Sequence, residues 1–149
     1  MRARTESATA ALVELAASLR FEDIPGLGMA HVRHAFLDTV GCMLAGAPSE
    51  DALPVIGWVD ALSGVAESIV VGSSRRAPAS LAAFANGTSA HALDLDDFSP
   101  TMMHPSVCLV PPVLALGERE RSSGREAITA YAAGFEVMAR LCRALNPGH

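Results

Sequence analysis

Reactive side chains gather in one stretch of the sequence, where His91 is followed by Asp94, Asp96 and Asp97. If the preceding helix reached Asp97, then His91, Asp94 and Asp97 would lie three residues apart on one face, and Asp96 would point elsewhere. Carboxylates at a helix C-terminus interact unfavourably with the helix dipole. Their presence there favours the interpretation that they bind a partner group or take part in a reaction. Two further interpretations stay open at this point. The aspartates can simply be solvated around a turn, or they can hold Mg²⁺ or Mn²⁺ together with histidine.

A second candidate is His104, which stands directly before Pro105. Proline favours the first position of a helix, and a helix N-terminus offers free backbone N–H groups that bind a carboxylate. A histidine beside such a site can act as a general acid or base near neutral pH. The alternative is a helix cap or a surface residue. His31 and His34 on an amphipathic helix, and His149 at the chain end, are weaker candidates.

The elements that must position these residues are mostly helical. Apolar residues at helical spacing, bounded by Gly and Pro, predict six helices. They cover residues 5–19, 32–44 with a stop at Gly46, 51–62, 79–93, a helix opened by Pro105, and 123–145. One short β-branched stretch, 67–71, favours a strand, closed by the turn that follows it. The sequence therefore predicts an all-α fold with at most one short strand or hairpin near residues 67–74.

Local signals refine this prediction. Pro111 and Pro112 lie inside the helix that Pro105 opens, and they predict a kink or a restart, because proline lacks the backbone donor. Residues 123–126 form a capping box before the last helix, and residues 146–148 end that helix. Gly87 costs about 1 kcal/mol relative to alanine inside a helix, so it predicts close approach of another helix or of a ligand.

Composition excludes several classes of protein. Half of the 149 residues are hydrophobic and the mean hydropathy is +0.31, which excludes a disordered chain. The net charge of −5, with eleven arginines and no lysine, argues against nucleic-acid binding. Three scattered cysteines predict neither a disulfide framework nor a zinc site, and no apolar run is long enough to cross a membrane. We expect a cytoplasmic protein. Its helices have wide apolar faces, which suit a dimer interface or an absent partner domain.

Several motifs, in order, resemble the MmgE/PrpD family, which contains 2-methylcitrate dehydratase and cis-aconitate decarboxylase. They are Phe-Leu-Asp-Thr-Val-Gly-Cys-Met-Leu-Ala-Gly at 36–46, Asn-Gly-Thr-Ser-Ala-His-Ala-Leu-Asp-Leu-Asp-Asp-Phe at 86–98, His-Pro-Ser at 104–106, Pro-Pro-Val-Leu-Ala-Leu-Gly-Glu at 111–118, Ser-Gly at 123–124 and Ala-Tyr-Ala-Ala-Gly-Phe-Glu-Val at 130–137. The resemblance implies that residues 1–149 are the N-terminal part of the family's helical domain. It also implies that the remaining helices and an α/β lid of the family are absent from these residues.

The resemblance also implies an activity. Members of the family are homodimeric enzymes that act on small di- or tricarboxylic acids without a metal or other cofactor. Carried over to this sequence, the catalytic residues are His104 and Asp94, and the substrate-binding residues are His91, Asp97, Phe98 and Ser106. Many members have a small hydroxyl residue where this chain has Phe98, so the exact acid stays open.

The chemistry of these residues agrees with a lyase. Loss of water from a hydroxy acid, or of a carboxylate from an unsaturated acid, needs an acid or base near neutrality and donors that hold carboxylates. His104 could supply the first, and Asp94 could orient it or a substrate hydroxyl. In the family, lysines and a second histidine come from segments beyond those present here. We therefore expect a 2-methylcitrate dehydratase-like lyase that is inactive as this chain alone. The alternative is a non-catalytic helical remnant that dimerises or binds a partner.

Overall fold

The computed structural model describes residues 7–62 and 64–145. Within them lie six α-helices, a short 3-10 helix and a two-stranded hairpin, so the predicted all-α fold is confirmed. The elements are α1 (Ala8–Ser18), η1 (Phe21–Asp23), α2 (Gly26–Gly46), α3 (Ala52–Ala61), β1 (Ser68–Ile69), β2 (Arg76–Ala77), α4 (Ala79–His91), α5 (Pro105–Glu120) and α6 (Gly124–Leu145).

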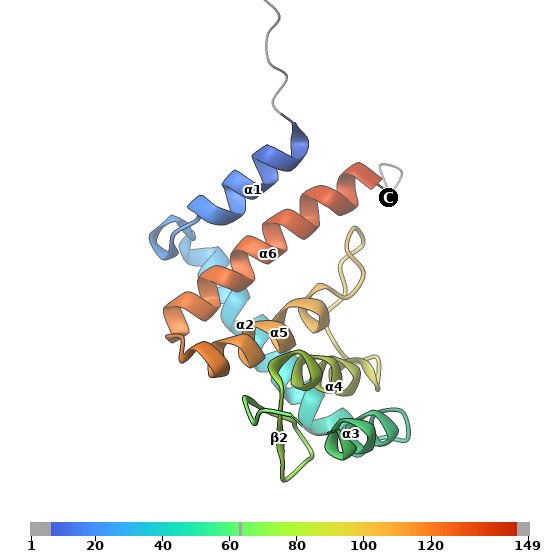
Figure 1. Cartoon of the computed structure of the whole chain (residues 1–149). Helices are drawn as coiled ribbons and strands as arrows, with labels where there is room; N and C mark the ends of the chain where they lie inside the picture. Colours follow the sequence, from blue (N-terminus) through green and yellow to red (C-terminus); the bar gives the residue numbers. More distant parts are fainter. Residues whose placement is uncertain (1–6, 63, 146–149) are drawn as a thin grey trace, which may run out of the picture.

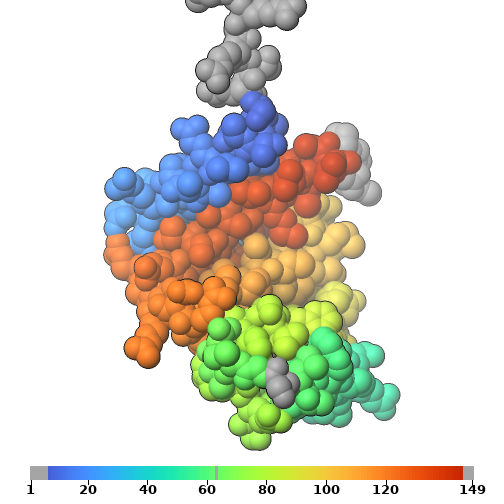
Figure 2. Space-filling view, viewed as in Figure 1, coloured from blue at the N-terminus to red at the C-terminus, as the bar shows by residue number. Residues whose placement is uncertain are grey.

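The helices form two neighbouring groups (Figure 1). At one end α1 lies along α6, and at the other α3 and the hairpin pack against α4. Helix α2 runs between the two ends and contacts α4, α5 and α6. Figure 2 shows α1 lying on α6 across one face of the molecule. No helix in the described part of the chain combines the length and the apolar character needed to span a membrane.

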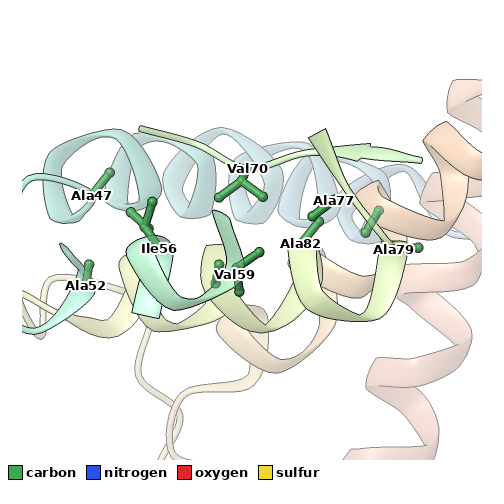
Figure 3. Packing of buried hydrophobic residues seen from close by; sticks show 10 residues of the cluster. Ala47, Ala52, Ile56, Val59, Val70, Ala77, Ala79 and Ala82 are labelled. Atoms are coloured by element: carbon green, nitrogen blue, oxygen red, sulfur yellow. The ribbon is translucent and has the colours of Figure 1, made fainter. Parts of the chain in front are cut away.

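Each group has its own core. The core around α3, α4 and the hairpin is built largely from small side chains, with Ile56, Val59 and Val70 filling the space between alanines (Figure 3). The second core joins α2, α5 and α6 and contains Val110 and Tyr131, which are both almost completely buried. Tyr131 brings a hydroxyl group into this second core, and that hydroxyl takes part in the candidate site described below.

Gly46 allows α2 and α4 to approach closely. A Cβ atom on Gly46 would lie 1.9 Å from the carbonyl oxygen of Ser89 in α4, a distance that no Cβ atom tolerates. The neighbour of Gly87 is also a helix, α5, but a Cβ on Gly87 would lie 3.4 Å from the carbonyl oxygen of Val107, which is ordinary van der Waals contact. The approach at Gly87 therefore does not require a glycine.

The hairpin agrees with the predicted position but is shorter and shifted. The strand predicted over 67–71 is reduced to Ser68–Ile69, and its antiparallel partner, Arg76–Ala77, lies beyond residue 74. The buried side chain of Asn86 explains the short strand. Its amide group donates to the Ile69 carbonyl and accepts from the Val71 N–H, both at 2.9 Å, so a side chain replaces a third strand.

Of the two outcomes predicted at Pro111 and Pro112, a kink or a restart, the restart is wrong, because α5 runs without interruption through both. Pro111 is fully buried, and the carbonyl of Val107, four residues earlier, lies against Gly87 of α4. Packing on α4 therefore compensates for the hydrogen bond that proline removes. Helix α2 also begins earlier than predicted, immediately after Pro25.

The helix ends agree with the remaining signals. Ser7 caps α1, where its Oγ accepts the N–H of Ala10 at 3.1 Å. The capping box before α6 is confirmed, since Ser123 N–H donates to Glu126 Oε2 at 2.7 Å and Ser123 Oγ accepts from Glu126 N–H at 3.3 Å. The predicted stop at 146–148, His149 and the first two residues of the helix predicted over 5–19 lie outside the described residues.

Candidate functional site

The candidate site lies on the loop between α4 and α5. Helix α4 ends at His91, and Asp94 takes a left-handed conformation with φ 52°. The prediction that His91, Asp94 and Asp97 share one helical face is therefore wrong. Aspartate tolerates this conformation because its short polar side chain can bond locally.

The far end of the loop is also held in an unusual conformation. Met103, directly before His104, has φ 59°, which costs about 1–3 kcal/mol for a residue of this type. Paired backbone hydrogen bonds with Ser99, at 2.7 and 2.8 Å, hold it there. The chain therefore accepts local strain at the position that orients His104.

Four side chains from the loop and its flanks form a cluster: His91, Asp94, Asp96 and His104. Asp96 is central, because its Oδ1 lies 3.0 Å from His91 Nδ1 and its Oδ2 lies 3.0 Å from His104 Nδ1. The other nitrogen of His104, Nε2, is 3.7 Å from Asp94 Oδ1. The two imidazole rings meet edge to face, with their centroids 4.7 Å apart. The cluster has a clear inner and outer side: the Asp96 side chain is completely buried, His104 is 22% exposed, and Asp94 is 79% exposed.

Asp96 and His104 lie close together but do not form a hydrogen bond. His91 Nδ1 and Asp96 Oδ1 form a hydrogen bond, whereas His104 Nδ1 and Asp96 Oδ2 approach to 3.0 Å without hydrogen-bond geometry. Both of these atoms are buried and lack a hydrogen-bond partner among the described residues. The only groups within ion-pair distance of Asp96 in the described part of the chain are the two imidazoles.

The N-terminus of α5 binds an anion from the protein itself. His104 is the N-cap residue, but its side chain makes no capping bond. Instead, Asp97 Oδ1 accepts the N–H of Ser106 at 3.1 Å. The carboxylate site predicted beside His104 is therefore already partly used by Asp97, and the His104 imidazole is left to face Asp94 and Asp96.

Asp97 continues into a buried network. Ser106 Oγ donates to Asp97 Oδ2 at 2.5 Å and lies 2.8 Å from Tyr131 Oη. Ser106 is fully buried. Burial raises the pKa of Tyr131, the hydrogen bond with Ser106 lowers it, and the negative charge of Asp97 raises it further. The network ties the loop to both α5 and α6.

Phe98 lies beside the cluster and is 63% exposed. Its ring packs edge to face on His104, with the centroids 5.7 Å apart. Phe98 also lines a groove of about 880 Å³ between α1, α2, α6 and the loop. His31 and His34, the weaker candidates, line the same groove and do not belong to the cluster.

The structure thus separates the predicted residues into groups. His91, Asp94 and His104 come together, Asp97 and Ser106 bond to each other, and Phe98 covers one side of His104. Sequence reasoning missed Asp96, which it pointed away from the site, and Tyr131, which it assigned only to the buried face of a helix. Once the helix ends at His91, helical spacing no longer applies to the aspartates. The end of the helix at His91 was the signal that the sequence patterns did not provide.

The arrangement suits proton transfer. A carboxylate at His104 Nδ1 favours the tautomer with its proton on that nitrogen, which leaves Nε2 on the Asp94 side to exchange protons. The same four side chains offer ligand atoms that all lie within 4.8 Å of one another, which is close enough to hold one metal ion.

The fold and site define an all-α protein with a histidine–aspartate cluster on an interhelical loop. The chain matches the MmgE/PrpD N-terminal domain over residues 10–149 and belongs to that family. Among curated proteins, it is 32% identical over 114 residues to cis-aconitate decarboxylase of Mus musculus and of Homo sapiens. These alignments cover 73% of this chain and 23–24% of the relatives.

A third relative is the cis-aconitate decarboxylase-like protein oryM of Aspergillus oryzae, which is 29% identical over 145 residues. That alignment covers 92% of this chain and 30% of the relative. The chain therefore spans less than a third of the length of the curated proteins it matches. No solved structure matches it significantly.

Proposed function

We propose that this chain is the N-terminal part of a lyase that acts on small di- or tricarboxylic acids. The observation that carries the proposal is the cluster itself, in which Asp94, Asp96 and His104 meet in a chain of the MmgE/PrpD family. His104 acts as the general acid or base, Asp96 orients it, and Asp94 faces the reacting acid. His91, Asp97, Phe98 and Ser106 stay proposed substrate-binding or supporting residues.

Decarboxylation of cis-aconitate is the first reaction to test, because two of the relatives are cis-aconitate decarboxylases. In such a reaction the bond to one carboxylate breaks as CO₂ leaves, and a proton is delivered to carbon. Dehydration of 2-methylcitrate needs the same group to remove a proton from carbon and another to protonate the leaving hydroxyl. We assign either step to His104 Nε2.

A single assay separates these reactions. The longest protein that carries this chain is incubated with cis-aconitate and with 2-methylcitrate, and CO₂ and the unsaturated acid are measured. CO₂ release supports the decarboxylase, and water loss from 2-methylcitrate supports the dehydratase. Absence of both reactions in that protein favours the alternative, a non-catalytic helical remnant.

We further propose that residues 1–149 alone are inactive and that no cofactor is required. The described cluster has two imidazoles but no arginine within ion-pair distance of its aspartates, and the sequence has no lysine. A polycarboxylate therefore lacks cationic partners here. Turnover of either acid by the purified 149-residue chain would contradict the proposed inactivity.

A homodimer is the proposed assembly. Helix α2 leaves Leu37 and Leu44 74% and 64% exposed, and residues seven apart lie on the same helical face. Light scattering of the chain should give twice the monomer mass of 15.5 kDa.

A cytoplasmic location stays a proposal, supported by Cys42, Cys108 and Cys142, which are all free thiols.

A further inference from the structure

We infer that the His91, Asp94, Asp96 and His104 cluster binds a divalent transition-metal ion of the Zn²⁺ or Co²⁺ type. Each residue offers one ligand atom, and these atoms lie within 4.8 Å of one another. Two ligands of a tetrahedral Zn²⁺ ion are about 3.4 Å apart, given bonds of about 2.1 Å. His91 Nδ1 and His104 Nδ1 each lie 3.0 Å from an oxygen of Asp96, which is close to that spacing. Small side-chain movements would therefore complete a coordination sphere.

A second observation independently points to a cation. The Asp96 side chain is completely buried, and its Oδ2 faces His104 Nδ1 without a hydrogen bond. An ionised carboxylate is costly to bury unless a positive charge or hydrogen bonds compensate for it. Within the described residues, only the two imidazoles are near enough to provide compensation. A metal ion between these groups would satisfy the buried oxygen atom.

The donor set selects the type of ion. Two imidazole nitrogens and two carboxylate oxygens favour Zn²⁺ and its neighbours over Mg²⁺, which prefers oxygen ligands and keeps several waters. The site is open on one side, because His91 and Asp94 have side chains 51% and 79% exposed. An ion from solution can therefore enter without unfolding the loop.

Metal binding has a consequence for the proposed lyase. An ion on His104 Nδ1 would keep the single ring proton on Nε2, so that nitrogen could no longer accept a proton and act as a base. This consequence rests on the proposed function, whereas the binding itself does not. Such an ion would be an inhibitor of the reaction rather than its cofactor.

Titration of the 149-residue chain with Co²⁺, followed by its visible absorption, tests the binding without substrate. We expect one ion per chain, with ligand-field bands stronger than those of hydrated Co²⁺, and displacement by Zn²⁺. Asp96→Asn and His91→Ala should each weaken the affinity by more than about tenfold. The matched controls Asp38→Asn and His34→Ala, on exposed positions of α2, should leave it unchanged.

Circular dichroism shows whether each variant folds, which separates loss of metal binding from loss of structure. His91 is half exposed, so His91→Ala should fold even if loss of the buried Asp96 carboxylate disturbs the loop. Absence of Co²⁺ bands in the folded parent chain would overturn the inference. Full binding by folded His91→Ala, or loss of binding in His34→Ala alone, would also overturn it. None of these results depends on whether the protein turns over a carboxylic acid.

Discussion

Replacing Ser106 tests the buried network that holds the candidate loop. Its hydroxyl donates to Asp97 Oδ2 at 2.5 Å and contacts Tyr131 Oη at 2.8 Å, and the residue is fully buried. Ser106→Ala removes both contacts but keeps the backbone bond from Ser106 N–H to Asp97. The variant therefore probes the hydroxyl alone.

The magnitude follows from these contacts. A hydrogen bond to a charged group is worth about 1.5–3 kcal/mol, and a buried hydroxyl left without a partner costs about 1–3 kcal/mol. Ser106→Ala should thus lower the free energy of unfolding by about 2.5–6 kcal/mol, the sum of the two terms. Tyr131→Phe should cost about 1 kcal/mol, because Ser106 keeps its bond to Asp97. In the double variant no tyrosine hydroxyl is left unpaired, so its cost should be about 1 kcal/mol less than the sum of the single costs.

Urea unfolding followed by circular dichroism measures all three variants against the parent chain. The double-mutant cycle isolates the contact between the two hydroxyls. If the single costs add to within about 0.5 kcal/mol of the double, the two hydroxyls are not coupled and the network is refuted. A cost below about 1 kcal/mol for Ser106→Ala would likewise show that its hydroxyl is not held between two buried partners.

Three further measurements follow from the structure. Gly46→Ala should destabilise the chain by more than about 2 kcal/mol through overpacking, whereas Gly41→Ala, with open space at its Cβ, should be neutral or stabilising in urea unfolding. Tyr131 is the only tyrosine, so phenolate absorbance should report a pKa above 10.0 in the folded chain. Stability should fall as pH rises past 10.0, because the unfolded chain loses this proton first, and an ordinary folded pKa would contradict the burial argument. Burial, and then the charges of nearby aspartates, raise the pKa of the Cys42 thiol. Iodoacetamide should therefore label Cys42 more slowly than the exposed Cys108, as measured by mass spectrometry. Equal labelling rates would refute this prediction.

The sequence predicted the helices well because their signals are local. The capping box at 123–126 and the helix opened by Pro105 are set by side chains within one turn of the helix ends. The hairpin was only partly predicted, because its length depends on Asn86, a residue of α4 that bonds to the strand. The restart predicted at Pro111 and Pro112 failed for the same reason, since packing on α4 compensates for the missing donor.

The sequence predicted most residues of the candidate site but not how they are arranged. His91, Asp94 and His104 do meet, but they meet around Asp96, which helical spacing placed elsewhere. Two left-handed residues, Asp94 and Met103, turn the loop so that this becomes possible. A left-handed backbone at a methionine has no signal in the residue type, because backbone hydrogen bonds to Ser99 hold it there.

The central claim is that His104, oriented within this cluster, performs the acid–base step of a lyase. Its most direct test is the kcat for cis-aconitate and for 2-methylcitrate of the longest protein that carries this chain, compared between the parent, His104→Ala and the control Glu120→Gln, which is exposed and outside the groove and the cluster. We expect His104→Ala to lower kcat by about a hundredfold or more, as loss of a general acid or base does, while Glu120→Gln stays close to the parent. An active protein whose kcat is unchanged by His104→Ala would contradict the account.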